Sequence, residues 1–390
     1  MINKIRGSFR KNKDEILSLL SFSAPQFVYG RKRFSDIPVF CFHSVDPATF
    51  EKHLEFIRDN KFITLDGDEY LERKSDKKYK NNGKEILLTF DDGMSSVWTA
   101  GLPLLEKYKK KIMLFILPGM MSAEEGVGAT LFDEGSKKDH DDIINRDYSD
   151  NPLCNWSEIE VMHQSGRVDI QSHGMHHMLI STSSYIEDFI HPGFDAHHYG
   201  NIHIPGYIDA AMSGRLVRNK VSGHPVYRHS PRLSGKPRYI DQEEVRIACA
   251  EYVRENGGDQ YFEQASWREQ LHSVASKSIP VIDEYESGEE IAREMRYELE
   301  ESKKIIEDRL SGKTVRHFCY PWFSACMESV TLAHEAGYEA VHLGASAGFK
   351  PAEKYDNPVL VTRLQEEYLR ALPGFGSYSL LKVLASKISR

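Results

Sequence analysis

Two adjacent carboxylates at the end of an apolar stretch are the residues most suggestive of chemistry. Residues 85–90 read EILLTF, an apolar and partly branched run that predicts a buried strand of a parallel sheet. Asp91, Asp92 and Gly93 follow it directly. Because a strand end bends, both carboxylates can point into one cleft at the carboxyl end of the strand, where ligands of α/β folds bind. Their mutual repulsion requires a cation or a shared proton; a turn that simply ends the strand is the alternative.

Two histidines four residues apart can supply further metal ligands. His173 and His177 follow a second apolar stretch, and a helical turn there would place both imidazoles on one face. Two imidazoles and one carboxylate are a common ligand set for a catalytic divalent ion with open coordination positions. A lone histidine pair at this spacing is usually structural, so the prediction depends on its combination with Asp91 and Asp92. One aspartate would then bind the metal, and the other would remain free to act as a base.

Strands and helices must alternate along the chain to hold these side chains together. Apolar strands are predicted at residues 37–42, 112–117, 168–171, 314–320 and 339–343. Helices are predicted at residues 102–108, 157–165, 291–312 and 330–336, the second with a capping box from Ser157 to Glu160. This alternation is typical of a parallel α/β sheet or barrel.

Residues 181–285 interrupt the alternation. They are rich in His, Tyr, Pro and Gly, and they contain one predicted helix with an apolar face from Val245 to Val253. We expect an insertion that folds over the mouth of the cleft and closes over a short substrate. A separate subdomain with no role in the chemistry is the alternative.

The composition is that of an ordinary globular protein. Hydrophobic residues make up 40% of the 390 residues and charged residues 28%, and the net charge of −8 gives no indication of nucleic-acid binding. Five cysteines without metal-type spacing favour a reduced compartment. No secretion-signal pattern and no stretch long enough to span a membrane stand out, so we expect a cytoplasmic protein.

Basic residues gather at both ends of the chain. Residues 1–35 are a predicted basic arm, with Lys4, Arg6, Arg10, Lys11 and Lys13. Residues 346–390 are a predicted extension with an amphipathic helix, whose apolar face has Leu380, Leu381, Leu384 and Ile388. A solvated arm with a docked helix is the simpler interpretation. Weak, salt-sensitive peripheral contact with the inner face of a membrane is the alternative.

Taken together, these motifs resemble those of the polysaccharide deacetylases of carbohydrate esterase family four, which share a domain with the nodulation chitooligosaccharide deacetylases. The residues TFDDG (89–93) are similar to the first motif of that family and SHGMHH (172–177) to the second. The residues FHSV (42–45), NW (155–156) and FCYPW (318–322) also match. The resemblance covers residues 36–180 and 286–345. The expected domain is therefore a deacetylase barrel over residues 36–345, interrupted by the insertion.

The resemblance implies a fold, a reaction and residue roles. The fold would be an α/β protein, a distorted (β/α) barrel of about seven strands. The reaction would be metal-dependent removal of an N-acetyl group from an amino-sugar-containing glycan or glycan precursor. Asp92, His173 and His177 would bind a divalent ion, with zinc expected first and cobalt, nickel or manganese as alternatives. Asp91 would be the general base.

Residues 320–322 would lie on the substrate side of the site. By the same resemblance, the backbone N–H of Tyr320 would stabilise the oxyanion, and Pro321 and Trp322 would form a wall for the sugar or its acetyl methyl group. Core packing is the alternative for Trp322.

Two features of the family pattern are missing from this sequence. An arginine that orients the base often begins the third motif, and Cys319 stands in that place. We find no Leu-x-His motif for the general acid, and Arg363 in VTRLQ lies near the expected position. The candidate replacements are His43, His342 and His229, although each of them is more typical of a structural or exposed histidine.

Two other functions are compatible with the same fold. One is an allantoinase-like hydrolase of a small non-sugar amide, and the other is a catalytically weakened carbohydrate-binding protein. The retained aspartates and histidines favour an enzyme, because a protein that only binds sugar needs neither a base nor a full ligand set. The expected partner is an N-acetylated sugar or glycan. Without an export segment, we expect an intracellular precursor, either lipid-linked or soluble.

Overall fold

A closed barrel of seven parallel strands forms the centre of the molecule. The computed structural model describes residues 25–30, 36–76, 78–133, 140–149, 152–194, 222–278, 283–344 and 358–388. The strand order is β1 (Val39–Phe42), β10 (Val359–Gln365), β9 (Ala340–Gly344), β8 (His317–Cys319), β5 (Val168–Ser172), β4 (Ile112–Ile116) and β3 (Glu85–Phe90). The barrel closes because β1 also pairs with β3, and β2 (Ile63–Leu65) pairs with the first half of β3. The predicted distorted (β/α) barrel is confirmed.

The strands divide their side chains between the barrel interior and an outer layer. Met113 and Phe115 of β4 belong to the interior cluster, whereas its alternate residue Leu114 belongs to the core between the strands and the surrounding helices. All five residues of β4 are buried. A strand covered on both faces must be apolar throughout, which explains the continuous apolar runs in the sequence.

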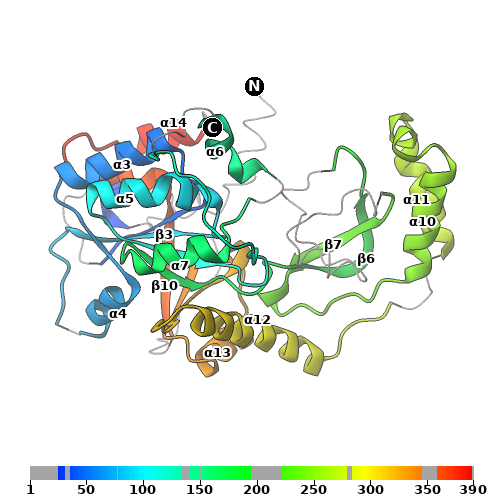
Figure 1. The fold of residues 1–390 in the computed structure, drawn as a ribbon. Helices are drawn as coiled ribbons and strands as arrows, with labels where there is room; N and C mark the ends of the chain where they lie inside the picture. Colours follow the sequence, from blue (N-terminus) through cyan, green and yellow to red (C-terminus); the bar gives the residue numbers. More distant parts are fainter. Residues whose placement is uncertain are drawn as a thin grey trace.

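Helices surround the barrel (Figure 1). They are α3 (Pro47–Asp59), α4 (Gly67–Ser75), α5 (Leu102–Tyr108), α7 (Trp156–Gln164), α12 (Gly288–Arg309) and α13 (Met327–Glu335), with the short α6 (His140–Ile144) and the C-terminal α14 (Leu380–Ile388). The start of α7 differs from the prediction. Asn155 and Glu158 form its capping box, and the predicted box of Ser157 and Glu160 is wrong. The earlier start places the buried Trp156 in the first turn, where it packs in the outer core.

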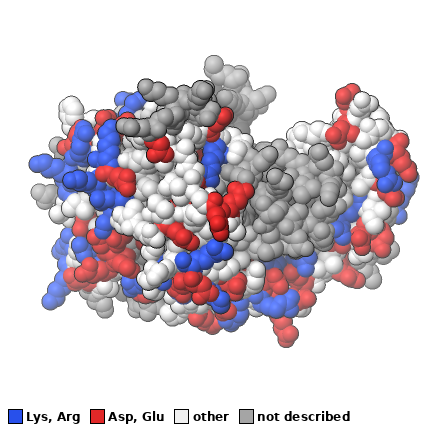
Figure 2. All heavy atoms as spheres, viewed as in Figure 1, with Lys and Arg blue, Asp and Glu red and all other residues white. Residues whose placement is uncertain are grey.

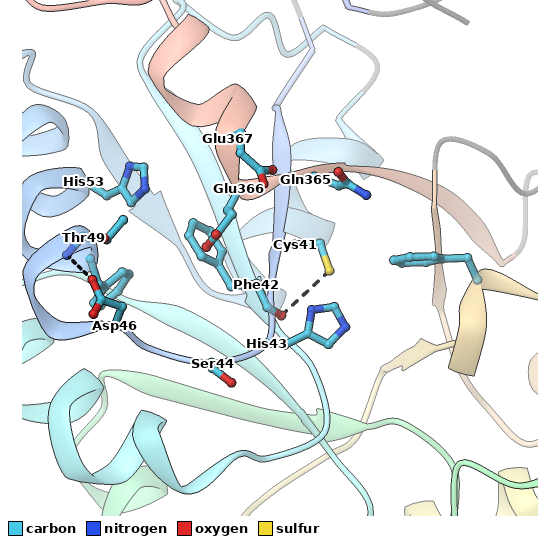
Figure 3. A pocket seen from close by; sticks show the side chains of 12 residues that line it. Cys41, Phe42, His43, Ser44, Asp46, Thr49, His53, Gln365, Glu366 and Glu367 are labelled. Carbon is cyan, nitrogen blue, oxygen red and sulfur yellow. Dashed lines mark hydrogen bonds between the residues drawn. The ribbon is translucent and has the colours of Figure 1, made fainter. Parts of the chain in front are cut away.

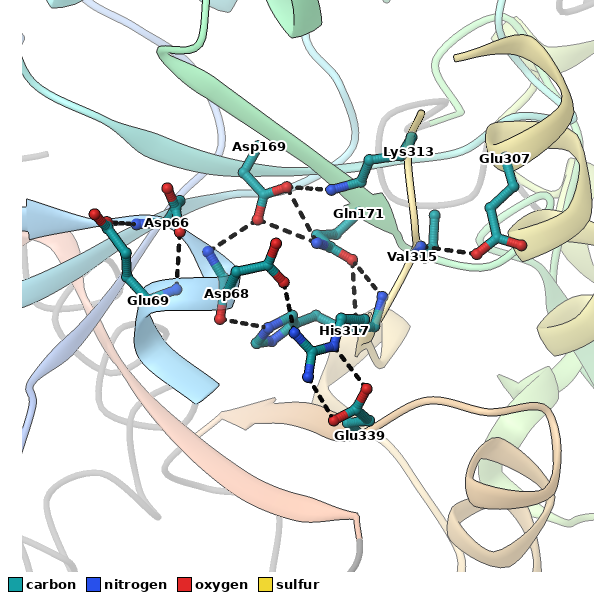
Figure 4. A network of polar contacts seen from close by, with 12 residues as sticks. Asp66, Asp68, Glu69, Asp169, Gln171, Glu307, Lys313, Val315, His317 and Glu339 are labelled. Carbon is teal, nitrogen blue, oxygen red and sulfur yellow. Dashed lines mark hydrogen bonds and ion pairs between the residues drawn. The ribbon is translucent and has the colours of Figure 1, made fainter. Parts of the chain in front are cut away.

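A polar network lies at the amino-terminal ends of the strands (Figure 4). Asp169 of β5 pairs with Lys313 and accepts a hydrogen bond from the N–H of Gly67 at 2.9 Å. The side-chain oxygen of Gln171 accepts from the N–H groups of Arg316 and His317, both at 3.0 Å. These contacts fix the end of the barrel that is opposite to the carboxyl ends of the strands.

The segment predicted as an insertion contains an antiparallel ribbon and a group of helices. The ribbon pairs β6 (Leu179–Phe189) with β7 (Pro225–Pro231), and α10 (Glu243–Glu255), the 3-10 helix η7 (Gly258–Glu263) and α11 (Trp267–Ser278) follow. These elements share a hydrophobic cluster of their own, which includes Phe189, Cys249 and Trp267. Figure 1 shows α10 and α11 at the end of the ribbon that is far from the barrel. The domain limits and the closing of this segment over a substrate stay predictions.

The chain ends were predicted to be basic and amphipathic. The basic residues of the arm lie outside the described residues. In α14, Val383 is fully buried, whereas Leu381 is 80% exposed, so the prediction that Leu381 lies on the packed face is wrong.

Within the described ranges no helix is long and apolar enough to cross a membrane. Figure 2 shows one face of the molecule, where acidic and basic side chains are interleaved over much of the described surface.

Candidate metal and catalytic site

The three predicted metal ligands come together at the carboxyl ends of β3 and β5. One ligand atom from each of Asp92, His173 and His177 lies within 4.8 Å of the others. Oδ1 of Asp92 is 3.4 Å from Nε2 of His173 and 3.7 Å from Nε2 of His177. This Oδ1 atom is buried and has no hydrogen-bond partner among the described residues. A carboxylate oxygen that has no hydrogen-bond partner and faces two imidazole nitrogens fits a divalent cation.

The orientation of His173 is set by a backbone carbonyl. Its Nδ1 lies 2.8 Å from the carbonyl oxygen of Cys319. Because a carbonyl only accepts, Nδ1 must carry the hydrogen, and in the neutral ring the lone pair then lies on Nε2, the atom that faces Asp92. Burial lowers the pKa of His177 to about 4 despite the opposing charge of Asp92, so this ring is neutral at neutral pH. A neutral imidazole is the form that binds a metal ion.

Asp91 is held by an arginine whose role was not predicted from the sequence. Arg363 at the end of β10 donates to Oδ1 of Asp91 at 2.6 Å and to Oδ2 at 2.8 Å. The thiol of Cys41 donates to Oδ2 at 3.5 Å, and Cys319 lies at 3.8 Å. Burial alone would raise the pKa of Asp91, but the Arg363 guanidinium outweighs it and holds the pKa below its ordinary value. Asp91 is therefore ionised and firmly oriented, and an ionised carboxylate can accept a proton.

A strained backbone surrounds the cluster. Four of the six described non-glycine residues with positive φ lie here: Asp92 at 69°, His177 at 55°, Trp322 at 57° and Phe323 at 53°. Side-chain-bearing residues rarely adopt this conformation, and such strain persists where the surrounding structure imposes it. At Asp92 and His177 the unusual turns aim the two ligands at a common point.

The residues predicted for the substrate side have different surroundings. Trp322 is 36% exposed and its ring centroid lies 4.9 Å from that of His177, so core packing is not its role. Pro321 is buried next to it. The N–H of Tyr320 donates to the carbonyl oxygen of His342 at 3.1 Å. This backbone bond occupies the N–H that was predicted to stabilise an oxyanion, so the structure contradicts that part of the prediction.

The three histidines considered as general acids have different surroundings in the structure. His342 is fully buried and hydrogen-bonded to His317 at 3.0 Å. His229 lies in β7, with its Nδ1 3.6 Å from Glu187 of the ribbon. His43 follows β1, is 56% exposed in its side chain, and has its Nε2 3.9 Å from Oδ2 of Asp91. Only His43 of the three combines exposure with contact to the site.

A pocket of about 550 Å³ opens at the end of β1 (Figure 3). Cys41 and His43 at the end of β1 line one part of it, and Glu366 and Glu367 after β10 line another. Phe323 contributes an aromatic wall. The pocket therefore offers polar and aromatic surface for a small ligand, and its lining residues Cys41 and His43 contact Asp91.

Arg363→Lys tests whether bidentate contact is what holds Asp91. Lysine keeps the positive charge but cannot donate two parallel hydrogen bonds, so we expect a loss of about 1.5–3 kcal/mol in the free energy of unfolding. Urea unfolding measures this loss. The matched control is Arg316→Lys, because Arg316 makes the same fork to Glu339 but is 30% exposed, where the loss should stay below about 1 kcal/mol. Equal losses in the two variants would contradict this assignment.

Comparisons with known proteins bear on this site directly. Residues 78–189 match the family profile described as polysaccharide deacetylase, a range that contains both the Asp91–Asp92 and the His173–His177 motifs. The putative polysaccharide deacetylase YxkH of Bacillus subtilis (strain 168) is 31% identical in an alignment of 90 residues that covers 21% of this chain. The match spans 32% of the length of that relative, so it concerns a part of each protein.

Two solved structures align with most of this chain at low sequence identity. A de-N-acetylase from Aggregatibacter actinomycetemcomitans aligns over 87% of this chain and 97% of its own, with a TM-score of 0.50 and 14% identity. The deacetylase domain of BpsB from Bordetella bronchiseptica aligns over 85% and 97%, with a TM-score of 0.48 and 17% identity. At such low identity the first of these alignments indicates a common fold.

Proposed function

Because residues 78–189 carry the sequence of a polysaccharide deacetylase domain, we propose that this protein is a metal-dependent hydrolase that removes an N-acetyl group from an amino-sugar-containing glycan or glycan precursor. The observation that carries the proposal is that the two adjacent aspartates have different partners. Asp92 faces His173 and His177 with an unpaired oxygen, whereas Asp91 faces Arg363. One carboxylate is thus available to a cation and the other to a proton.

The chain's own residues supply the remaining chemistry. When bound, a divalent ion, zinc by first expectation, would lower the pKa of water and polarise the amide carbonyl. Asp91 takes the proton from the attacking water, and Arg363 keeps the carboxylate in place while it does so. The amide C–N bond then breaks, acetate leaves, and the sugar nitrogen must gain a proton to depart as an amine.

His43 is the residue that we assign to protonate the amine. Its exposed side chain places Nε2 3.9 Å from Oδ2 of Asp91, and it lines the pocket. His43→Gln should lower turnover about 10²–10⁴-fold, the usual contribution of general acid–base catalysis, with little change in bound metal. Steady-state kinetics and metal analysis of the same preparations measure both quantities.

The control for this variant is His334→Gln, because His334 is exposed on α13 and forms no part of the site. A His43→Gln protein with turnover equal to that of the control would show that the proton comes from elsewhere.

Product analysis tests the reaction class. The metal-loaded protein is incubated separately with N-acetylglucosamine oligosaccharides and with allantoin; acetate is assayed in the first sample and allantoate, the ring-opened ureide acid, in the second. The proposal predicts acetate from the sugar and no allantoate from allantoin. Allantoate from allantoin would favour an allantoinase-like hydrolase, and sugar binding without either product would favour a carbohydrate-binding protein.

A further inference from the structure

We propose that Glu298 and Ser302 of α12 are positioning residues for the metal site, because they hold the loop that carries both histidine ligands. This inference rests on the proposed function insofar as it takes His173 and His177 to be metal ligands. Neither Glu298 nor Ser302 is itself one of the three proposed ligands. They would act through the backbone and the neighbouring serine of the segment from Ser172 to His177.

Glu298 binds the middle of the loop. Its Oε2 accepts a hydrogen bond from the N–H of Met175 at 2.7 Å and from the N–H of His176 at 3.3 Å. Its Oε1 lies 3.3 Å from Nδ1 of His176. The residue is 5% exposed, so these contacts are shielded from water. A buried carboxyl group that accepts three hydrogen bonds from one short loop fixes both the position and the shape of that loop.

The loop has a shape that needs such support. Gly174 has a φ of 86° and His177 has a φ of 55°, so the chain turns sharply on both sides of the two N–H groups that Glu298 binds. A Cβ atom at Gly174 would lie 3.1 Å from Oε2 of Glu298, which shows how closely the loop approaches the carboxyl group. Because the loop forms no helix, the N–H groups of Met175 and His176 have no helical carbonyl to bind and need another acceptor. Glu298 supplies this acceptor between the two ligands.

Ser302 fixes the start of the loop in the same way. It lies one turn after Glu298, so the two side chains project from the same face of α12. Its hydroxyl lies 2.8 Å from the hydroxyl of Ser172, the residue directly before His173, and 2.7 Å from the carbonyl oxygen of Glu298. Met295, Leu299 and Ile306 bury the same helix in the core around the barrel. A rigid helix therefore contacts the loop at two points on either side of the first ligand.

Metal affinity is the quantity that this arrangement should control. Glu298→Gln replaces one acceptor oxygen by an NH₂ group, which must face an N–H donor or the Nδ1 of His176. We expect Zn²⁺ to bind about 10–100-fold more weakly, the usual effect of losing a partner that orients metal ligands. Ser302→Ala should weaken Zn²⁺ binding by a smaller factor. Competition with a chromogenic chelator measures the affinity, and the visible absorption spectrum of the Co²⁺-loaded protein reports the ligand geometry.

The matched control is Glu300→Gln. Glu300 lies on the same helix two residues further on, and its side chain is 56% exposed. The thermal unfolding midpoint of each metal-free variant is measured in parallel, so that a general loss of stability is separated from a local loss of affinity. We expect weaker Zn²⁺ binding and a changed Co²⁺ spectrum for Glu298→Gln, with Glu300→Gln unchanged in both.

Two results would overturn the inference. The first is Zn²⁺ affinity within twofold of the control for both Glu298→Gln and Ser302→Ala. The second is a lower unfolding midpoint for either variant with an unchanged Co²⁺ spectrum and affinity. If Glu298→Gln does not fold, Ser302→Ala alone decides by the same two measurements. Failure of the unsubstituted protein to bind Zn²⁺ or Co²⁺ would instead overturn the metal-dependent function on which the inference rests.

Discussion

Asp91→Asn is expected to lower turnover about 10²–10⁴-fold while leaving most metal binding intact. The amide is nearly isosteric with the carboxylate, but it cannot take a proton from the attacking water. The contact with Arg363 adds a second consequence, because both partners are almost fully buried. A buried guanidinium that loses its ionised partner is costly, and breaking such a pair typically destabilises a protein by about 3–5 kcal/mol. Turnover must therefore be measured well below the unfolding transition of the variant.

Asp169→Asn is the matched control for stability. Asp169 pairs with Lys313 at the opposite end of the barrel, and both side chains are largely buried. This variant should also lose stability, but it should keep its turnover because it leaves the site untouched. Near-normal turnover of Asp91→Asn, or an equal loss of turnover in Asp169→Asn, would show that Asp91 is not the base.

Substitution of any one metal ligand is expected to remove most bound metal and nearly all activity. Asp92→Ala, His173→Ala and His177→Ala each leave two ligands, and three protein ligands provide little redundancy. Loss of His173 should have the broadest effect, because its Nδ1 contact with Cys319 joins the metal site to the strand that precedes residues 320–322. Metal content by plasma mass spectrometry and turnover are measured on the same samples.

His334→Ala is the control for these three variants, since it removes an exposed imidazole outside the site. Metal binding by the control should equal that of the unsubstituted protein. Unchanged metal content in all three ligand variants would contradict the assignment of the site.

The barrel and the metal cluster follow from signals that are local in the sequence. Strands β3 and β4 are covered on both faces, so residues 86–88 and 112–116 form continuous apolar runs. The chemical residues come directly after such runs, and the carboxyl ends of parallel strands meet at one end of a barrel. The closeness of Asp92, His173 and His177 is therefore predictable from the sequence alone.

The roles of Arg363 and Tyr320 depend on contacts between distant strands, which no local pattern specifies. Arg363 reaches Asp91 because β10 pairs with β1, which also pairs with β3. Its one signal in the sequence is a charged residue in the second half of the strand Val359–Gln365, after three apolar residues and towards the end where chemical residues gather. The N–H of Tyr320 is occupied because the carbonyl of His342 on the neighbouring chain segment lies within reach. Glu298 carries no local signal either, because it is one of many acidic residues on a long helix.

Competition between neighbouring local signals explains two smaller errors of the sequence-based prediction, at the start of α7 and on the packed face of α14. Asn155 and Ser157 are both good N-caps with an acidic residue three positions later, and the burial of Trp156 decides in favour of the first. In α14 Leu380 and Val383, three residues apart, both pack against the core, so the adjacent Leu381 must point to solvent. The cytoplasmic location and the intracellular substrate stay predictions.

The most direct test of the central claim is mass spectrometry of an N-acetylglucosamine oligosaccharide after incubation with the protein. Three samples are compared: protein stripped of metal by a chelator, the same protein reloaded with zinc, and Asp92→Ala in the presence of zinc. We predict that only the reloaded protein yields a product lighter by one acetyl group, together with an equal amount of acetate. Equal deacetylation by the stripped protein or by Asp92→Ala, or intact sugar in all three samples although the reloaded protein holds zinc, would contradict the proposed metal-dependent deacetylation.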